Sequence, residues 1–113
     1  MDVMTDVYCI IPVTDITRSV EWFTAFFGRS AEHVIGGEYL WQIGANGYVV
    51  IDDRRAHPGT AEVTIGIEHL DELLARLDGH GIAHQPAETY GSGVKHVTVI
   101  DPDGNELSLA QAP

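Results

Sequence analysis

Apolar and polar residues follow one another along the chain in a pattern that occurs twice. In the first half, the apolar, β-branched residues 7–13 predict a buried strand. Apolar residues at helical spacing follow from Ile16 to Phe27, with Thr14 or Asp15 placed to cap the helix and Gly28 to end it. Three strands are then predicted between glycine-rich breaks, at residues 32–35, 39–43 and 48–52.

The second half repeats this order. A strand is predicted at residues 62–67, and a helix is predicted from leucines at helical spacing that end near Gly79 and Gly81. Ile11 aligns with Ile65, 54 positions later, and Val49 aligns with Leu107, 58 positions later, so the second copy is four residues longer. We place these extra residues in the loop at 89–93. The remaining predicted strands are residues 82–87, 94–100 and 106–110.

These elements predict an α+β fold made of two βαβββ modules within a single domain of residues 1–113. Module one covers 6–53 and module two covers 61–111. The linker at 54–60 is polar and contains Pro58 and Gly59. A chain of 113 residues with 44% hydrophobic residues is long enough to bury a core.

The charge of the chain narrows the choice of partners. Six Lys and Arg against 17 Asp and Glu give a net charge of -11, which repels phosphate backbones and anionic lipid headgroups. We therefore expect neither a nucleic-acid nor a membrane partner. The acidic start, Met1-Asp2, lacks the basic region of a signal peptide, and no apolar run approaches the roughly 20 residues of a membrane span, so we expect a cytoplasmic protein. The single cysteine, Cys9, is predicted to be a reduced, buried thiol.

The repeat and two motifs resemble the vicinal oxygen chelate superfamily, which includes glyoxalase I, bleomycin resistance proteins and extradiol dioxygenases. One motif is the helix sequence Ser19-Val20-Glu21-Trp22-Phe23, which continues to Phe27-Gly28. The other is Asp101-Pro102-Asp103-Gly104-Asn105 before the last strand, which also has the composition of a tight turn. The resemblance covers the whole chain. It implies a cup-shaped mixed sheet with the helices on the convex face and a small-molecule site on the concave face.

Alternation along the strands predicts which side chains face that site, because residues i and i+2 share a face of a strand. Val63 and Ile65 are expected to pack on the second helix, which leaves Glu62 and Thr64 on the concave face. The same reasoning places Tyr8 in the first strand, His96 in the seventh, and Glu106 and Ser108 in the eighth on this face. The predicted ligand-binding residues are Tyr8, Trp41, Glu62, Thr64, His96, Glu106 and Ser108.

In enzymes of the superfamily, His, Glu or Gln side chains from the first, fourth, fifth and eighth strands generally hold a divalent metal. The corresponding residues here are Tyr8, Val50, Glu62 and Ser108, of which only Glu62 is an ordinary metal ligand. No metal ligands and no cofactor are therefore predicted. A non-standard metal site built from His96, Glu62 and Glu106 is the alternative.

An aromatic, hydroxylic and acidic surface suits a planar or cationic ligand. The resemblance, in its metal-free bleomycin-resistance branch, implies a metal-independent small-molecule binder of the antibiotic-sequestering type. The alternative is an enzyme, a lyase or isomerase, with Glu62 as general base and His96 assisting, or with an unorthodox metal. A third possibility is a subunit whose partner is another protein. Members of the superfamily commonly pair, so a homodimer is also expected.

Overall fold

The computed structural model describes residues 3–113 and contains the two repeats in sequence order. Met1 and Asp2, on which the expectation about a signal peptide rests, lie outside the described residues. The predicted α+β fold with two βαβββ modules is confirmed. The elements of the first are β1 (Val7–Pro12), α1 (Ile16–Phe27), β2 (His33–Ile35), β3 (Glu38–Ile43) and β4 (Gly47–Asp52). The elements of the second are β5 (Glu62–Gly66), α2 (Leu70–Gly79), β6 (Glu88–Thr89), β7 (Lys95–Ile100) and β8 (Glu106–Gln111).

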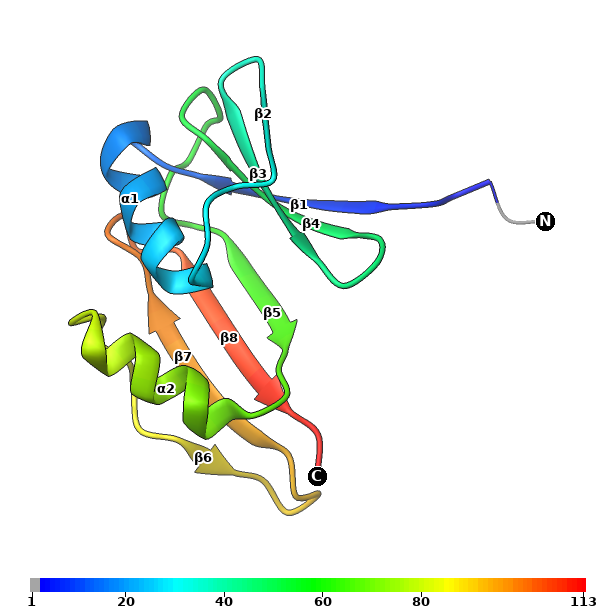
Figure 1. The fold of residues 1–113 in the computed structure, drawn as a ribbon, viewed down its shortest axis with the longest axis vertical. Helices are drawn as coiled ribbons and strands as arrows, with labels where there is room; N and C mark the ends of the chain where they lie inside the picture. The colour runs from blue at the N-terminus through cyan, green and yellow to red at the C-terminus, as the bar shows by residue number, and fades with distance from the viewer. Residues whose placement is uncertain (1–2) are drawn as a thin grey trace.

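The strands form two four-stranded sheets with the same topology. The strand order is β1-β4-β3-β2 in one and β5-β8-β7-β6 in the other. In each sheet the first and last strands of the module pair in parallel, and the other pairs are antiparallel. The two sheets are open and separate, one above the other, with α1 and α2 on the same side of the molecule (Figure 1). No helix in residues 3–113 is long and apolar enough to cross a membrane.

Helix α1 begins and ends where its sequence predicts. The Asp15 carboxylate accepts a hydrogen bond from the Arg18 backbone N–H at 3.2 Å, which is the geometry of an N-cap. Gly28 adopts a left-handed conformation with φ of 74° and donates its N–H to the Thr24 carbonyl, so it ends the helix. The buried face of the helix carries Phe23 and Phe26. Cys9, on the first strand, is free but half-buried rather than fully buried.

One predicted strand is wrong. Residues 82–87 are not a strand, and the short β6 begins only at Glu88. The Ile82 N–H still bonds to the Leu77 carbonyl at the end of α2, and Pro86 has no N–H to offer a neighbouring strand. Within this segment, the Gln85 N–H bonds to the Thr98 carbonyl. Residues 90–94 join β6 to β7, whereas only Gly36 and Gly37 join β2 to β3. The second repeat is therefore longer than the first in the loop where we placed the extra residues.

The two modules are held together by a hydrophobic core and by polar contacts. The core includes Ile11, Phe23 and Trp41 from the first repeat and Leu77, Val99 and Leu107 from the second. Asn105 is fully buried and forms what we call the Asn105 bridge: its side-chain amide donates to the Pro12 carbonyl at 2.9 Å and accepts from the Ala61 N–H at 3.0 Å. The Arg76 guanidinium on α2 donates to the Phe26 carbonyl on α1.

The Asp-Pro-Asp-Gly-Asn motif therefore does more than form a turn. The turn itself is as predicted: the Asp101 carboxylate accepts from the N–H groups of Asp103 and Asn105, and Gly104 has a φ of 102°. In addition, the Thr14 hydroxyl donates to the Asp103 carboxylate at 2.5 Å, which joins the start of α1 to the last turn of the chain. The motif thereby sets how one sheet lies relative to the other.

Candidate functional site

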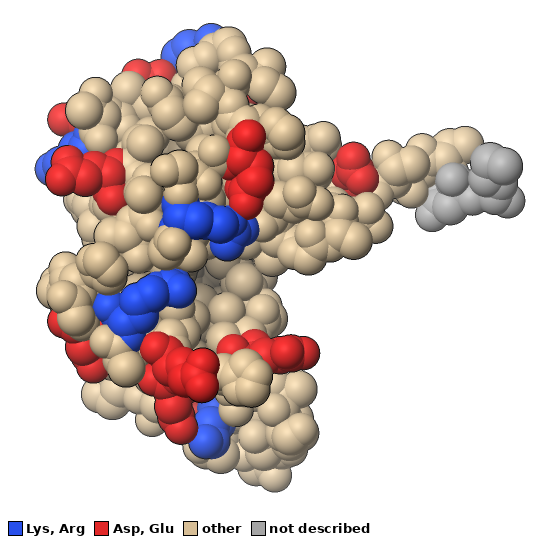
Figure 2. All heavy atoms as spheres, in the orientation of Figure 1, with Lys and Arg blue, Asp and Glu red and all other residues tan. Residues whose placement is uncertain are grey.

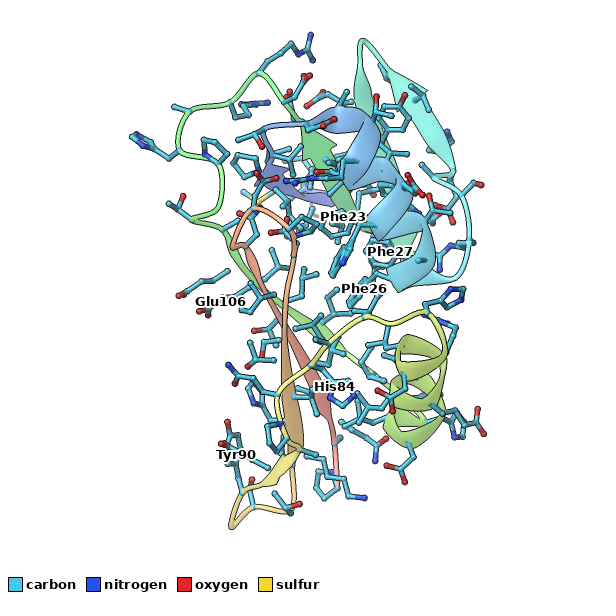
Figure 3. The ribbon with its side chains drawn as sticks, turned by 90° about the vertical axis from the view of Figure 1, so that its left-hand side faces the viewer. Phe23, Phe26, Phe27, His84, Tyr90 and Glu106 are labelled. Atoms are coloured by element: carbon cyan, nitrogen blue, oxygen red, sulfur yellow. The ribbon has the colours of Figure 1, made fainter. Side chains whose placement is uncertain are left out.

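The face of the second sheet that lies away from α2 carries most of the predicted site residues, and we call it the open face of module two. On β5, Glu62 and Thr64 are exposed whereas Ile65 is buried, and on β8, Glu106 is exposed whereas Leu107 and Leu109 are fully buried. The predicted alternation of these strands is confirmed. Figure 3 shows Glu106 and Tyr90 on the side of the sheet opposite α2.

Strand register brings these side chains into rows across the open face. Glu62 lies directly opposite Glu106 in the parallel β5–β8 pair. In the next row, Ser108 lies between Thr64 on β5 and Thr98 on β7. Side chains directly opposite one another are about 5 Å apart at Cβ, so the first row concentrates two negative charges and the second concentrates three hydroxyls.

His96 and Ser108 are in direct contact on this face. The His96 Nε2 and the Ser108 Oγ share a hydrogen bond, and both side chains are half-buried. The Tyr90 ring stacks on the His96 ring with 5.7 Å between centroids and 24° between planes. Tyr90 was not among the predicted ligand-binding residues. The sequence pattern placed the sixth strand at residues 82–87, whereas β6 is Glu88–Thr89 and ends next to Tyr90. With β6 placed correctly, the antiparallel register would have brought Tyr90 near His96.

The corresponding face of the first sheet is aromatic. Tyr8 on β1 lies opposite Tyr48 on β4, and their rings stack with 4.8 Å between centroids and 9° between planes. Tyr8 remains 53% exposed, whereas the neighbouring Val50 is buried. Because Tyr8 and Glu62 belong to separate open sheets, neither sheet alone encloses a ligand.

A cavity of about 580 Å³ lies between the modules, but it contains none of the predicted site residues. Its walls include Phe27 and Ile43 from the first repeat and Ile65 from the second, with Arg29 and Arg76 on opposite sides. Figure 2 shows the corresponding hollow between the two halves, with basic side chains above and below it.

Comparison with known proteins supports the fold and leaves the activity open. No family profile and no curated protein sequence matches the chain. A glyoxalase/bleomycin resistance protein from Catenulispora acidiphila DSM 44928 has a similar structure, with a TM-score of 0.88 and 28% identity, over 97% of this chain and 100% of that one. The antibiotic-binding protein TnmS3 from Streptomyces sp. CB03234 has a TM-score of 0.82 and 21% identity, over 100% of this chain and 99% of that one. A lactoylglutathione lyase from Agrobacterium tumefaciens has a TM-score of 0.75 and 15% identity, over 93% of this chain and 91% of that one.

This chain has the vicinal oxygen chelate fold. A lyase and an antibiotic-binding protein share that fold, so the fold by itself does not decide between catalysis and binding. Whether a protein with this fold catalyses a reaction or only binds a ligand depends on the side chains on its open faces.

The metal positions of vicinal oxygen chelate enzymes do not suit a metal in this chain. Tyr8, Val50, Glu62 and Ser108 stand at these positions, and Val50 is a buried hydrocarbon side chain without a donor atom. Divalent transition metals need several imidazole, carboxylate or thiolate ligands. Within residues 3–113, no three His, Cys, Asp or Glu side chains are grouped closely enough to hold an ion. The residues at these four positions therefore do not fit a divalent transition metal.

Trp41 was predicted to contact ligand, and the structure places it elsewhere. Its side chain is fully buried on the helix side of the first sheet, where its ring stacks on Phe27 at 5.3 Å. Its indole N–H donates to the Arg29 carbonyl at 2.9 Å, so its one polar group is already satisfied. A residue in this position stabilises the core, and we remove Trp41 from the candidate site.

A polar cluster at the end of β4 was not predicted. Asp52 is only 2% exposed, and its carboxylate accepts hydrogen bonds from the Arg54 N–H at 2.8 Å and from the Arg55 Nε at 3.1 Å. Burial alone would raise the pKa of Asp52, but the hydrogen bonds that its carboxylate accepts from the Arg54 backbone and from both guanidinium groups lower it to about 2. The sequence signal was the Asp-Asp-Arg-Arg run at residues 52–55, of which Asp52 was assigned to the end of a strand and Arg54 and Arg55 to the linker.

Proposed function

We propose that this protein binds a small, planar, cationic molecule on its open faces without a metal, as an antibiotic-sequestering protein would. The observation that carries the proposal is the Glu62–Glu106 pair, which places two exposed carboxylates side by side with no cation bonded to either among the described residues. Two adjacent like charges repel each other, and a bound cation relieves that repulsion.

Aromatic rings complete the chemistry required for such a ligand. The stacked Tyr8–Tyr48 pair on the first sheet and Tyr90 on the second present ring faces and edges near the exposed surface. Rings of this kind attract cations and stack on planar groups. The net charge of -11 adds a long-range attraction for cations. The similarity to an antibiotic-binding protein supports this reading.

We further propose that a second copy of the chain closes the site. The open faces leave large side chains in solvent, including Tyr8 at 53% and Ile100 at 42% exposure. Ile100 lies directly opposite Glu106 at the edge of the acidic row. Pairing an open face of one copy with one of another would bury these side chains and dry the carboxylates, which strengthens their attraction for a cation.

The lyase or isomerase alternative has less support. A carboxylate that acts as general base is usually tuned by a desolvated pocket, whereas Glu62 is exposed to solvent in this chain. No observation joins Glu62 to His96 as a catalytic pair.

The test is a fluorescence titration with acridine orange, a planar cation, and with fluorescein, a planar anion of similar size, as the matched comparison. We expect acridine orange to bind and fluorescein not to bind. The double variant Glu62→Gln/Glu106→Gln should weaken acridine orange binding about tenfold, since each partly exposed charge contributes up to about 1 kcal/mol.

The control variant is Asp71→Asn, which removes an exposed carboxylate from α2 on the opposite side of the sheet and should leave the affinity unchanged. Equal binding of the two dyes, or equal loss of affinity in the control and the double variant, would show that the Glu62–Glu106 pair does not select the ligand.

A further inference from the structure

Beyond binding, the contact between His96 and Ser108 has the arrangement of a nucleophile and its base. We infer that Ser108 is a nucleophile activated by His96, and that the open face of module two can transfer an acyl group from small carboxylic esters to water. The geometry is the hydrogen bond between the Ser108 Oγ and the His96 Nε2. A serine hydroxyl becomes nucleophilic when a neighbouring imidazole can take its proton.

The structure also holds the imidazole in place. Tyr90 stacks on the ring of His96, and Glu88 lies directly opposite His96 in the antiparallel β6–β7 pair. With the ring proton on Nδ1, the Nε2 lone pair can accept the Ser108 hydroxyl proton, and the stacked Tyr90 ring fixes the plane of the imidazole. A base oriented by a third group is the arrangement that nucleophilic catalysis requires.

Hydroxyl groups flank the nucleophile on both sides. Thr64 and Thr98 lie directly opposite Ser108 on the two neighbouring strands. Neither threonine hydroxyl is bonded to another described residue, so both can donate to an oxygen that gains negative charge next to Ser108. Donors placed where charge develops lower the barrier of acyl transfer.

The reaction balances with water as the only co-reactant. The Ser108 Oγ attacks the ester carbonyl carbon and passes its proton to the His96 Nε2. The tetrahedral intermediate then breaks its bond to the alcohol oxygen, which takes that proton and leaves as the alcohol. Water attacks the acyl-serine, gives one proton to His96, and the carboxylic acid leaves as Ser108 regains its proton.

The test uses a fluorophosphonate probe, which phosphonylates activated serines, followed by intact-mass measurement and peptide mapping. We expect a mass increase of one phosphonyl group at Ser108, together with hydrolysis of p-nitrophenyl acetate above the background rate. Ser108→Ala should abolish both. His96→Gln, which keeps a hydrogen-bonding partner for Ser108, should slow labelling about 100-fold or more, the usual effect of removing a general base.

The control is Ser92→Ala, which removes an exposed serine from the β6–β7 turn and should change neither labelling nor hydrolysis. The inference is overturned if the folded protein is not labelled, if the label lies on another residue, or if His96→Gln reacts as fast as the unchanged chain. Neither probe carries a positive charge, so acridine orange binding can succeed while labelling fails, and the reverse result is equally distinguishable.

Discussion

At the scale of single residues, similar carboxylates have very different surroundings. Asp52 is buried and receives hydrogen bonds from the Arg54 backbone and two guanidinium groups, whereas Glu62 is exposed beside another carboxylate. The first arrangement stabilises the folded chain in its ionised form, and the second leaves negative charge available to a ligand.

The lowered pKa of Asp52 predicts a pH-dependent contribution to stability. The carboxyl has a pKa of about 2 in the folded chain against 3.8 as its ordinary value, so the unfolded state binds the proton more readily. The stabilisation, about 2 kcal/mol, is fully present above pH 4 and is lost as the pH falls from about 4 to about 2.

Urea unfolding of Asp52→Asn at several pH values checks this expectation. The variant should be less stable than the unchanged chain at pH 7, and the difference should shrink below pH 4. The neighbouring Asp53→Asn is the control, because Asp53 is exposed, and it should show no such trend. A difference that stayed constant from pH 7 to pH 3 would mean that ionised Asp52 contributes nothing to stability.

Residue positions were predictable from the sequence where one face of a strand is polar. Glu62, Thr64, Glu106 and Ser108 were placed correctly on their face because apolar and polar residues alternate strictly in β5 and β8. Trp41 was misplaced because apolar and aromatic residues occur on both faces of β3, so composition could not say which face meets the helix. Trp41 pairs with Val49, which faces the helix, so Trp41 faces the helix as well. This pairing is a property of the folded sheet and cannot be read from the sequence of β3 alone.

At the scale of elements, the end of α1 is joined to α2 by one side chain. The Arg76 guanidinium donates to the Phe26 carbonyl in the last turn of α1 and lies over Gly28. Helix boundaries followed from the sequence because Asp15 and Gly28 are local signals. The position of strand β6 did not follow from the sequence, because its two residues form a strand by pairing with β7 and carry no local pattern.

Substitution of Gly28 by alanine tests the contact between the helices. An alanine Cβ would lie 2.8 Å from the Arg76 Nη1 and would also be strained by the φ of 74°. Gly36→Ala is the matched control, since its φ is also positive, at 57°, but no atom lies within 4 Å of the added Cβ. We expect a loss of about 1 kcal/mol for Gly36→Ala and up to about 1 kcal/mol more for Gly28→Ala in urea unfolding, because the flexible Arg76 side chain can move aside at the cost of its hydrogen bond to the Phe26 carbonyl.

A double-mutant cycle assigns the difference to its cause. In an Arg76→Ala background, Gly28→Ala should cost no more than Gly36→Ala. If the extra loss persists without the arginine, backbone strain alone explains the effect.

At the scale of the whole molecule, two open sheets are joined at their ends. The Asn105 bridge and the Thr14–Asp103 hydrogen bond lie near the turn before β8, and the shared core lies beside the helices. Residues 3–6 extend away from both sheets at the N-terminal side (Figure 1). This arrangement leaves both open faces accessible to a second copy.

A homodimer is the expected state in solution. Sedimentation velocity at micromolar concentration should give a species of about twice the chain mass of 12.3 kDa. Ile100→Glu, which adds charge to an exposed apolar side chain on the open face, should shift the protein toward monomer. Ala75→Glu adds the same charge on the exposed surface of α2 and should leave the dimer intact. A monomer at all concentrations would contradict the proposed closure of the site.

The separation of the exposed faces from the contacts that hold the fold has a consequence for how such a protein can evolve. Asn105, Arg76 and the buried aromatic residues maintain the fold, whereas exposed side chains such as Glu62, Thr64 and Glu106 contribute little to it. Exposed positions of this kind usually change stability by less than about 0.5 kcal/mol when substituted. If the proposed site is correct, mutations can alter which molecule it binds without unfolding the chain, and selection for a new ligand can act on these positions one at a time.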